Sequence, residues 1–130
     1  MDIRELRIGN FVTWSDDNDI LSVLTITGIT SPDTVWIDWE WNDGTKDSTD
    51  SGIDDINPIP ITPEWLERLG FEKMPPKNHW EEYWDKGILR LYITDGKISP
   101  IAVIHSKKPK YVHQLQNLFY ALTGEELTIK

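Results

Sequence analysis

The segment from Val35 to Trp41 alternates strictly between two kinds of side chain, and this pattern constrains the fold more than any other feature. One set of alternate positions holds Val35, Ile37, Trp39 and Trp41. The intervening set holds Trp36, Asp38 and Glu40. Because successive side chains of a strand point to opposite faces, the pattern predicts a half-buried strand over residues 34–41, with the first set facing a core.

The composition of the whole chain favours strands, and the first half shows several. Val, Ile and Thr together supply 32 of the 130 residues, whereas Ala, the best helix former, occurs twice. Further strands are predicted over residues 7–14 and 20–29, the second stopped by Gly28 and by Ser31-Pro32-Asp33, and residues 42–55 read as a polar surface loop. Several short strands within 60 residues predict an SH3-like antiparallel β-lobe.

A short helix is predicted to follow at residues 62–70. Thr62 can cap its first turn and Pro63 suits the first helical position, where no N–H is needed. Gly70 supplies the left-handed residue that ends many helices. Ile61 and Leu66 have the spacing of a hydrophobic staple across the helix start.

The second half predicts a β-β-β-α arrangement. Strands are expected over residues 80–84, 88–94 and 97–105, with turns at residues 85–87 and at Asp95-Gly96. Pro100 cannot donate to a ladder, which predicts an edge strand or a bulge there. An amphipathic helix is expected over residues 111–122 and ends at Gly124; its apolar stripe comprises Tyr111, Val112, Leu115, Leu118, Phe119 and Leu122.

The fold class is therefore α+β, with an N-terminal SH3-like lobe, a linking helix and an antiparallel sheet carrying a C-terminal helix. Charge is uneven: residues 1–60 carry 13 acidic and 3 basic residues, while residues 61–130 carry 9 and 10. This asymmetry favours two lobes, 1–60 and 61–130, over one compact domain.

The overall net charge of −9 argues against binding to a nucleic-acid backbone. The basic cluster Lys107-Lys108-Pro109-Lys110, beside His105, is best read as a solvated loop.

Two stretches carry a resemblance to a known family. Residues 5–12 (ELRIGNFV) and 111–127 (YVHQLQNLFYALTGEEL) resemble small proteins of gut Bacteroidetes and of their phages and mobile elements. A central marker of that family is similar to residues 59–64 (IPITPE) before Gly70-Phe71. No activity is assigned to this family, so the resemblance implies a bacterial or phage cytoplasmic setting and no functional residue.

Several kinds of chemistry are disfavoured. The chain has no Cys, which excludes thiol catalysis, disulfides and Cys-ligated metal. Asp47, Thr49 and Ser51 begin a calcium-loop pattern, but its terminal Glu position falls on Pro58. His79, His105 and His113 lack zinc-helix spacing, so no metal or cofactor is expected. No apolar run approaches the roughly 18 residues of a membrane span and no signal peptide opens the chain, so a cytoplasmic protein that does not enter a membrane is expected.

The first candidate binding site lies on the last predicted helix. Opposite the apolar stripe are His113, Gln116, Asn117 and Tyr120. This polar stripe is expected to face outward. A solvent-exposed helix face without a binding role usually carries charged residues, so the lack of charge on the stripe indicates contact with a partner. The alternative, which we favour, is that the stripe packs against the other lobe or against loops of the same chain.

The second candidate is the polar face of the alternating strand. Trp36 could stack on a sugar ring, and Asp38 and Glu40 have a spacing within the range of glycosidase carboxylates. Adjacent acids on an exposed strand are more often solubilising. The leading hypothesis is a non-enzymatic binding protein that contacts a protein. The alternatives are a carbohydrate or small-ligand binder, with or without hydrolysis, and an acidic mimic that blocks a nucleic-acid-binding protein; oligomeric state stays open.

Overall fold

The computed structural model describes residues 3–14, 23–41, 43–74, 83–86, 89–94, 97–100 and 109–129. The chain divides into two compact units. Met1–Ile59 and Tyr111–Asn117 form the first unit, and Pro60–Lys110 and Leu118–Lys130 form the second. The sequence-based division at residue 60 placed the whole last helix in the second half, whereas the first part of that helix belongs to the first unit.

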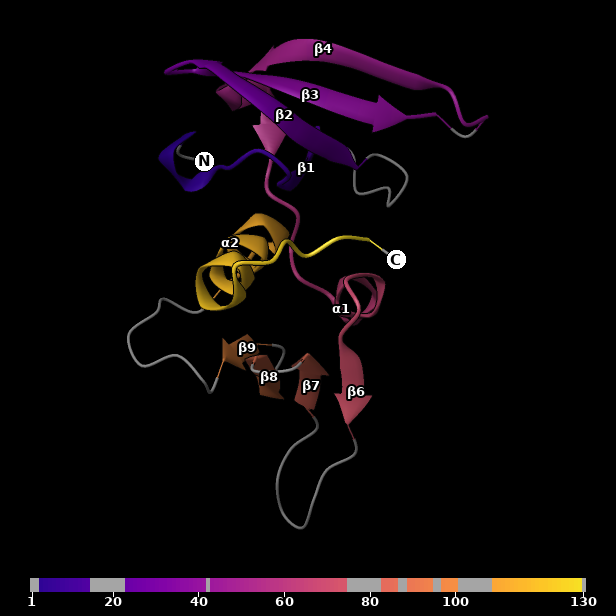
Figure 1. The fold of residues 1–130 in the computed structure, drawn as a ribbon, viewed down its shortest axis with the longest axis vertical. Helices are drawn as coiled ribbons and strands as arrows, with labels where there is room; N and C mark the ends of the chain where they lie inside the picture. The colour runs from indigo at the N-terminus through magenta and orange to yellow at the C-terminus, as the bar shows by residue number, and fades with distance from the viewer. Residues whose placement is uncertain are drawn as a thin grey trace. The chain divides into compact units, whose positions relative to one another are not determined.

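The first unit is built on a curled antiparallel sheet, which within the described residues has five strands in the order β4-β3-β2-β1-β5 (Figure 1). The strands are β1 (Phe11–Trp14), β2 (Leu24–Ser31), β3 (Thr34–Glu40), β4 (Lys46–Gly52) and β5 (Ile56–Asn57). Two 3-10 helices, η1 (Ile3–Glu5) and η2 (Ile53–Asp55), accompany them. The sheet curls at β1, which pairs with β2 through its first two residues and with β5 through its last two.

The predicted alternation of β3 is confirmed for six of its residues. Val35 and Ile37 are buried and Trp39 is half-buried, whereas Trp36, Asp38 and Glu40 are exposed. Val35 and Ile37 join a core whose other fully buried members are Leu6, Val12, Leu24, Ile26 and Ile56. The placement of Trp41 on the buried face is wrong, because this side chain lies beyond the end of β3 and is 53% exposed.

Several predicted boundaries in the first unit need correction. Residues 46–52 form strand β4 rather than part of a surface loop. The first strand begins at Phe11, after a turn in which Gly9 has φ 99°, and not at residue 7. The second strand runs over Leu24–Ser31 and continues through Gly28 with irregular register on both sides of it. Residues 20–22 of the predicted strand lie outside the described residues.

The second unit begins with α1 (Pro63–Arg68), as predicted. The Thr62 hydroxyl accepts a hydrogen bond from the Trp65 N–H (3.3 Å), and Pro63 occupies the first turn. Gly70 has φ 89°, a conformation that L side chains rarely adopt, and so ends the helix. Trp65 and Leu66 are buried, which anchors α1.

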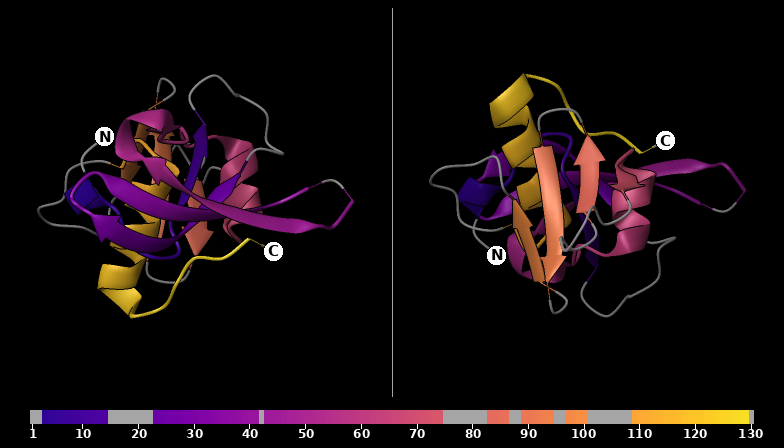
Figure 2. Two further views of the ribbon diagram at one scale, coloured as in Figure 1. Left: turned by 90° about the horizontal axis from the view of Figure 1, so that it is seen from above. Right: turned by 90° about the horizontal axis from the view of Figure 1, so that it is seen from below.

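The described strands of the second unit form one antiparallel sheet in the order β6-β7-β8-β9, labelled in Figure 1 and drawn from below in Figure 2 (right). They are β6 (Glu72–Met74), β7 (Tyr83–Lys86), β8 (Leu89–Thr94) and β9 (Lys97–Pro100). The prediction of three strands is wrong, since β6 was missed, and β7 extends into the predicted turn as far as Lys86. Pro100 lies in edge strand β9, as predicted. The Asp95-Gly96 turn and residues 80–82 and 101–105 of the predicted strands lie outside the described residues.

The predicted last helix is confirmed as α2 (Val112–Thr123). Gly124 follows it with φ 74°, and its N–H donates to the Tyr120 carbonyl (2.8 Å). Val112, Leu115 and Phe119 of the apolar stripe are buried, while Leu122 is 37% exposed. Neither helix in the described part of the chain is long and apolar enough to cross a membrane.

Candidate functional site

The predicted outward orientation of the polar stripe on α2 is wrong for two of its four residues. His113 and Gln116 are 1% and 0% exposed, and Asn117 is half-buried. Only Tyr120 of the four is exposed, at 43%. A helix can bury a polar face when other groups satisfy its hydrogen bonds, and here the N-terminal segment of the same unit does so.

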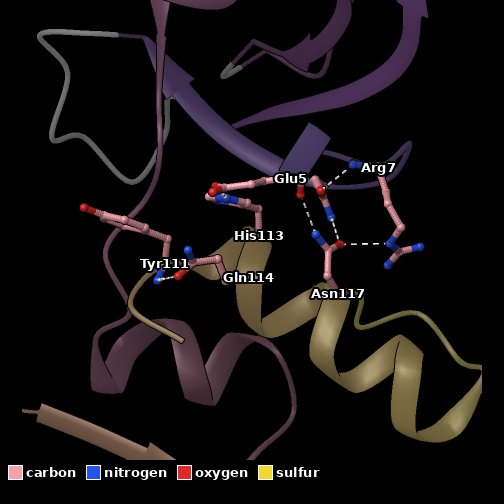
Figure 3. Close-up of polar contacts among 7 residues, drawn as sticks. Glu5, Arg7, Tyr111, His113, Gln114 and Asn117 are labelled. Carbon is pink, nitrogen blue, oxygen red and sulfur yellow. Dashed lines mark hydrogen bonds and ion pairs between the residues drawn. The ribbon is translucent and has the colours of Figure 1, made fainter. Parts of the chain in front are cut away.

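Gln116 and Asn117 hold this N-terminal segment through a polar network, of which Figure 3 shows the Asn117 contacts. Gln116 Oε1 accepts from the Phe11 N–H (2.8 Å), and its Nε2 donates to the Gly9 carbonyl (2.9 Å). Asn117 Oδ1 accepts from Arg7 Nε and from Asn10 Nδ2, both at 2.9 Å. Asn117 Nδ2 donates to the Glu5 carbonyl (2.7 Å). These residues therefore fix the entry into β1.

His113 lies beside this network without a hydrogen bond of good geometry at either ring nitrogen. Its Nε2 is 3.5 Å from Glu5 Oε2, and its ring stacks on Tyr111 with centroids 6.0 Å apart (Figure 3). Burial lowers the pKa of His113 below its ordinary value, and the nearby, half-exposed Glu5 carboxylate only partly opposes this. His113 is therefore neutral in the folded protein near pH 7.

The stability of the protein should consequently depend on pH through His113. Because its folded-state pKa is lowered, the unfolded chain takes up a proton first as the pH falls below about 6.5, and the folded state loses stability in that window. Urea unfolding at several values between about pH 8 and 5 should show wild type losing more stability than His113→Gln. His79 and His105 are present in both proteins and cancel from the difference. A difference that stays constant with pH would contradict the assignment.

The three residues of the second candidate site, Trp36, Asp38 and Glu40, lie on an exposed surface formed by β2, β3 and β4. We call it the outer face, and it consists of Thr27, Trp36, Asp38, Glu40, Lys46, Ser48 and Asp50, all exposed. The register places Asp50 opposite Trp36, Ser48 opposite Asp38 and Lys46 opposite Glu40. Directly opposed residues of an antiparallel pair lie on the same face, so these three pairs form one continuous surface. The Thr27 hydroxyl donates to Asp38 Oδ1 (3.2 Å).

Trp36 lies at one end of the outer face, beside Gly28 of β2. Gly28 lies opposite Trp36, and a Cβ at Gly28 would meet the Trp36 Cβ at 3.3 Å. Glycine therefore allows close approach of the two strands beside the indole. Trp36 is 40% exposed although it stands in the middle of a paired strand. A large aromatic at such a position is available for contact.

Near the turn between β3 and β4, a second group of aromatic side chains packs on the face of β3 opposite Trp36. Trp41 contacts Trp39 edge to face with centroids 6.0 Å apart, and Trp39 contacts Trp14 in the same way at 5.1 Å. The Thr45 N–H donates to Asp43 Oδ1 (2.9 Å). The hydrogen bonds from Thr45 lower the pKa of Asp43 below its ordinary value. The turn is therefore ordered by local bonds and carries a charged carboxylate.

The structure describes only some of the other groups considered in the sequence. His79, His105, Lys107 and Lys108 lie outside the described residues, while Pro109 is buried and Lys110 exposed. The proposed start of a calcium loop, from Asp47 to Gly52, lies in β4. Among the described residues there is no group of three or more His, Asp or Glu side chains that could hold a metal ion. Sequence reasoning missed Asp50, which only the register of β4 brings beside Trp36.

No protein-family model, curated protein or solved structure matches this chain.

Proposed function

We propose that this protein is a non-enzymatic binding protein that docks a positively charged partner protein on the outer face. One observation carries the proposal: Trp36 is 40% exposed on a regular strand, between the exposed carboxylates of Asp38 on β3 and Asp50 on β4. Exposed aromatics on ordered surfaces are enriched among residues that dominate binding energy. Carboxylates around such an anchor favour a partner that carries Lys or Arg.

The charge of the first half supports the same partner. Residues 1–60 have a net charge of −10, from 13 acidic and 3 basic residues. Such a field accelerates encounter with a basic partner and repels acidic ones. Of the polar stripe on α2, only Tyr120 is exposed enough to take part, because His113 is buried and Gln116 and Asn117 bind the chain's own N-terminal segment. The proposed docking surface is therefore the sheet and not the helix.

Two of the earlier alternatives use the same surface. Carbohydrate binding would place a sugar ring on Trp36, with Asp38 and Thr27 as hydrogen-bonding groups; however, the Thr27 hydroxyl is already engaged by Asp38. Hydrolysis would use Asp38 and Glu40, but both lie exposed on an open strand face. An acidic mimic of nucleic acid is a special case of the proposal, in which the basic partner is a nucleic-acid-binding protein.

Three finer expectations stay predictions and accompany this proposal. The first unit is expected to be SH3-like. The setting is expected to be bacterial or phage, as the sequence resemblance implies, and the compartment is expected to be the cytoplasm. None of these expectations is needed for the binding test.

The proposal is tested with a basic peptide, acetyl-Lys-Thr-Lys-Val-Lys-Thr-Lys-amide, titrated into the protein by calorimetry. The outer-face variant combines Asp38→Asn, Glu40→Gln and Asp50→Asn. The control variant combines Asp33→Asn, Asp54→Asn and Asp55→Asn, which removes the same charge from the same unit but outside strands β2, β3 and β4. The outer-face variant should bind about tenfold or more weakly, and the control variant about as well as wild type.

Salt concentration and truncation of a tryptophan side chain test the proposal in two further ways. Affinity should fall between about 0.05 and 0.5 M salt because exposed charges are screened. Trp36→Ala should weaken binding by about tenfold, whereas Trp41→Ala, at the turn, should have a smaller effect. Equal weakening by the outer-face and control variants would show only nonspecific attraction and would contradict the proposal. Binding to oligosaccharides but not to the peptide would favour the carbohydrate alternative.

A further inference from the structure

The hydrogen-bond pattern of the β3–β4 ladder shows which backbone groups of β4 point away from β3. The Trp41 N–H donates to the Thr45 carbonyl (2.7 Å), and the Ile53 N–H donates to the Asp33 carbonyl (2.8 Å). Both pairs continue the regular register between β3 and β4. Hydrogen-bonded pairs alternate with non-hydrogen-bonded pairs in an antiparallel ladder. The odd-numbered residues of β4 therefore exchange backbone hydrogen bonds with β3. The even-numbered residues direct their backbone N–H and C=O groups away from β3, to the outer edge of the sheet.

A side-chain contact independently supports this assignment. The Ser48 N–H donates to Asp47 Oδ1 (3.0 Å) rather than to β3, as an N–H directed to the outer edge would. β4 is the terminal strand of its sheet in the described part of the chain. The backbone groups of Lys46, Ser48 and Asp50 thus form a row at the edge of the outer face, with a period of two residues.

We infer that this edge of β4 receives an extended, lysine- or arginine-bearing segment of the partner protein, which adds to the sheet as a further strand. The inference rests on the proposed function and specifies how the partner docks. Strand addition supplies affinity through backbone hydrogen bonds and selectivity through alternate side chains. An added strand would place one set of its side chains beside Asp50 and Ser48, continuing the outer face outward.

Charge complementarity favours a basic segment at this edge. Strands β3 and β4 carry four carboxylates, Asp38, Glu40, Asp47 and Asp50, against the single base Lys46. These carboxylates attract the Lys or Arg side chains of an added basic strand, because opposite charges opposed across strands stabilise pairing.

The test separates backbone docking from charge attraction. Two isomers of the basic peptide are N-methylated at alternate residues, one on the odd and one on the even positions. They have nearly the same charge and composition, but only one retains the N–H groups that face β4 in any given register. The inference expects their affinities for the wild-type protein to differ by about tenfold or more. Equal affinities for the two isomers would overturn it.

Protein variants provide a second arm. Ser48→Pro removes an N–H at the outer edge without removing a bond to β3, a position where an edge strand tolerates proline. We expect about tenfold weaker binding for Ser48→Pro and less than about twofold change for the matched Ser48→Ala. Hydrogen exchange on the wild-type complex should show new protection at the amide of Asp50, which checks the result if Ser48→Pro folds poorly.

The outcomes distinguish the two proposals. Suppose that the peptide loses affinity for the outer-face variant, that both N-methylated isomers bind wild type as tightly as the unmodified peptide, and that Ser48→Pro binds the peptide as tightly as wild type. The proposed function then stands and strand addition is wrong. If the unmodified peptide does not bind wild type at low salt, both are wrong. Dependence on both the carboxylates and the backbone N–H groups supports both.

Discussion

Replacing Gln116 with leucine should lower the free energy of unfolding by about 2–6 kcal/mol, although leucine is the more apolar side chain. Gln116 is fully buried, and it satisfies both the Phe11 N–H and the Gly9 carbonyl. Removing it takes this partner from the buried Phe11 N–H and from the part-buried Gly9 carbonyl, and each such loss costs about 1–3 kcal/mol. Urea unfolding followed by tryptophan fluorescence measures the change.

The matched control is Gln114→Leu, on the same helix. Gln114 is half-buried, and its Oε1 accepts a longer bond (3.2 Å) from the Tyr111 N–H. Its replacement should cost about 1 kcal/mol. Equal effects of the two substitutions would mean that Gln116 does not anchor the N-terminal segment.

The two faces of β3 should respond differently to loss of an indole. Trp39→Ala should cost about 3 kcal/mol, because Trp39 is half-buried and packs edge to face between Trp14 and Trp41. Trp36→Ala, on the outer face, should cost about 1 kcal/mol or less. Thermal unfolding of the two variants measures both. Equal destabilisation would mean that β3 is buried on both sides and that Trp36 is not available to a partner.

Local chemistry in the sequence was sufficient to predict some elements. The helix α1 follows from Thr62, Pro63 and Gly70, each of which acts on the backbone within a few residues. The exposure of Trp36 follows from the period-two pattern of β3. In both cases the determinants lie inside the element itself, so no knowledge of distant contacts is needed.

Other features depend on groups far away in the chain. Gln116 reads as a solvent-facing residue because its partners, Gly9 and Phe11, lie more than 100 residues earlier. Helical periodicity reports apolar side chains and does not report a polar side chain whose hydrogen bonds are satisfied internally. Strand β4 was missed for a related reason: its side chains are mostly exposed and polar, so pairing with β3 and not burial defines it.

The central claim is that Trp36 on the outer face meets a basic partner, and fluorine NMR of the 5-fluorotryptophan-labelled protein tests it most directly. The chain has seven tryptophans, and comparison with Trp36→Phe assigns the resonance of Trp36. On addition of the basic peptide, the Trp36 resonance should shift, while those of Trp65 and Trp84, buried in the second unit, should stay in place. A Trp36 resonance that does not move while the peptide saturates the protein would contradict the account.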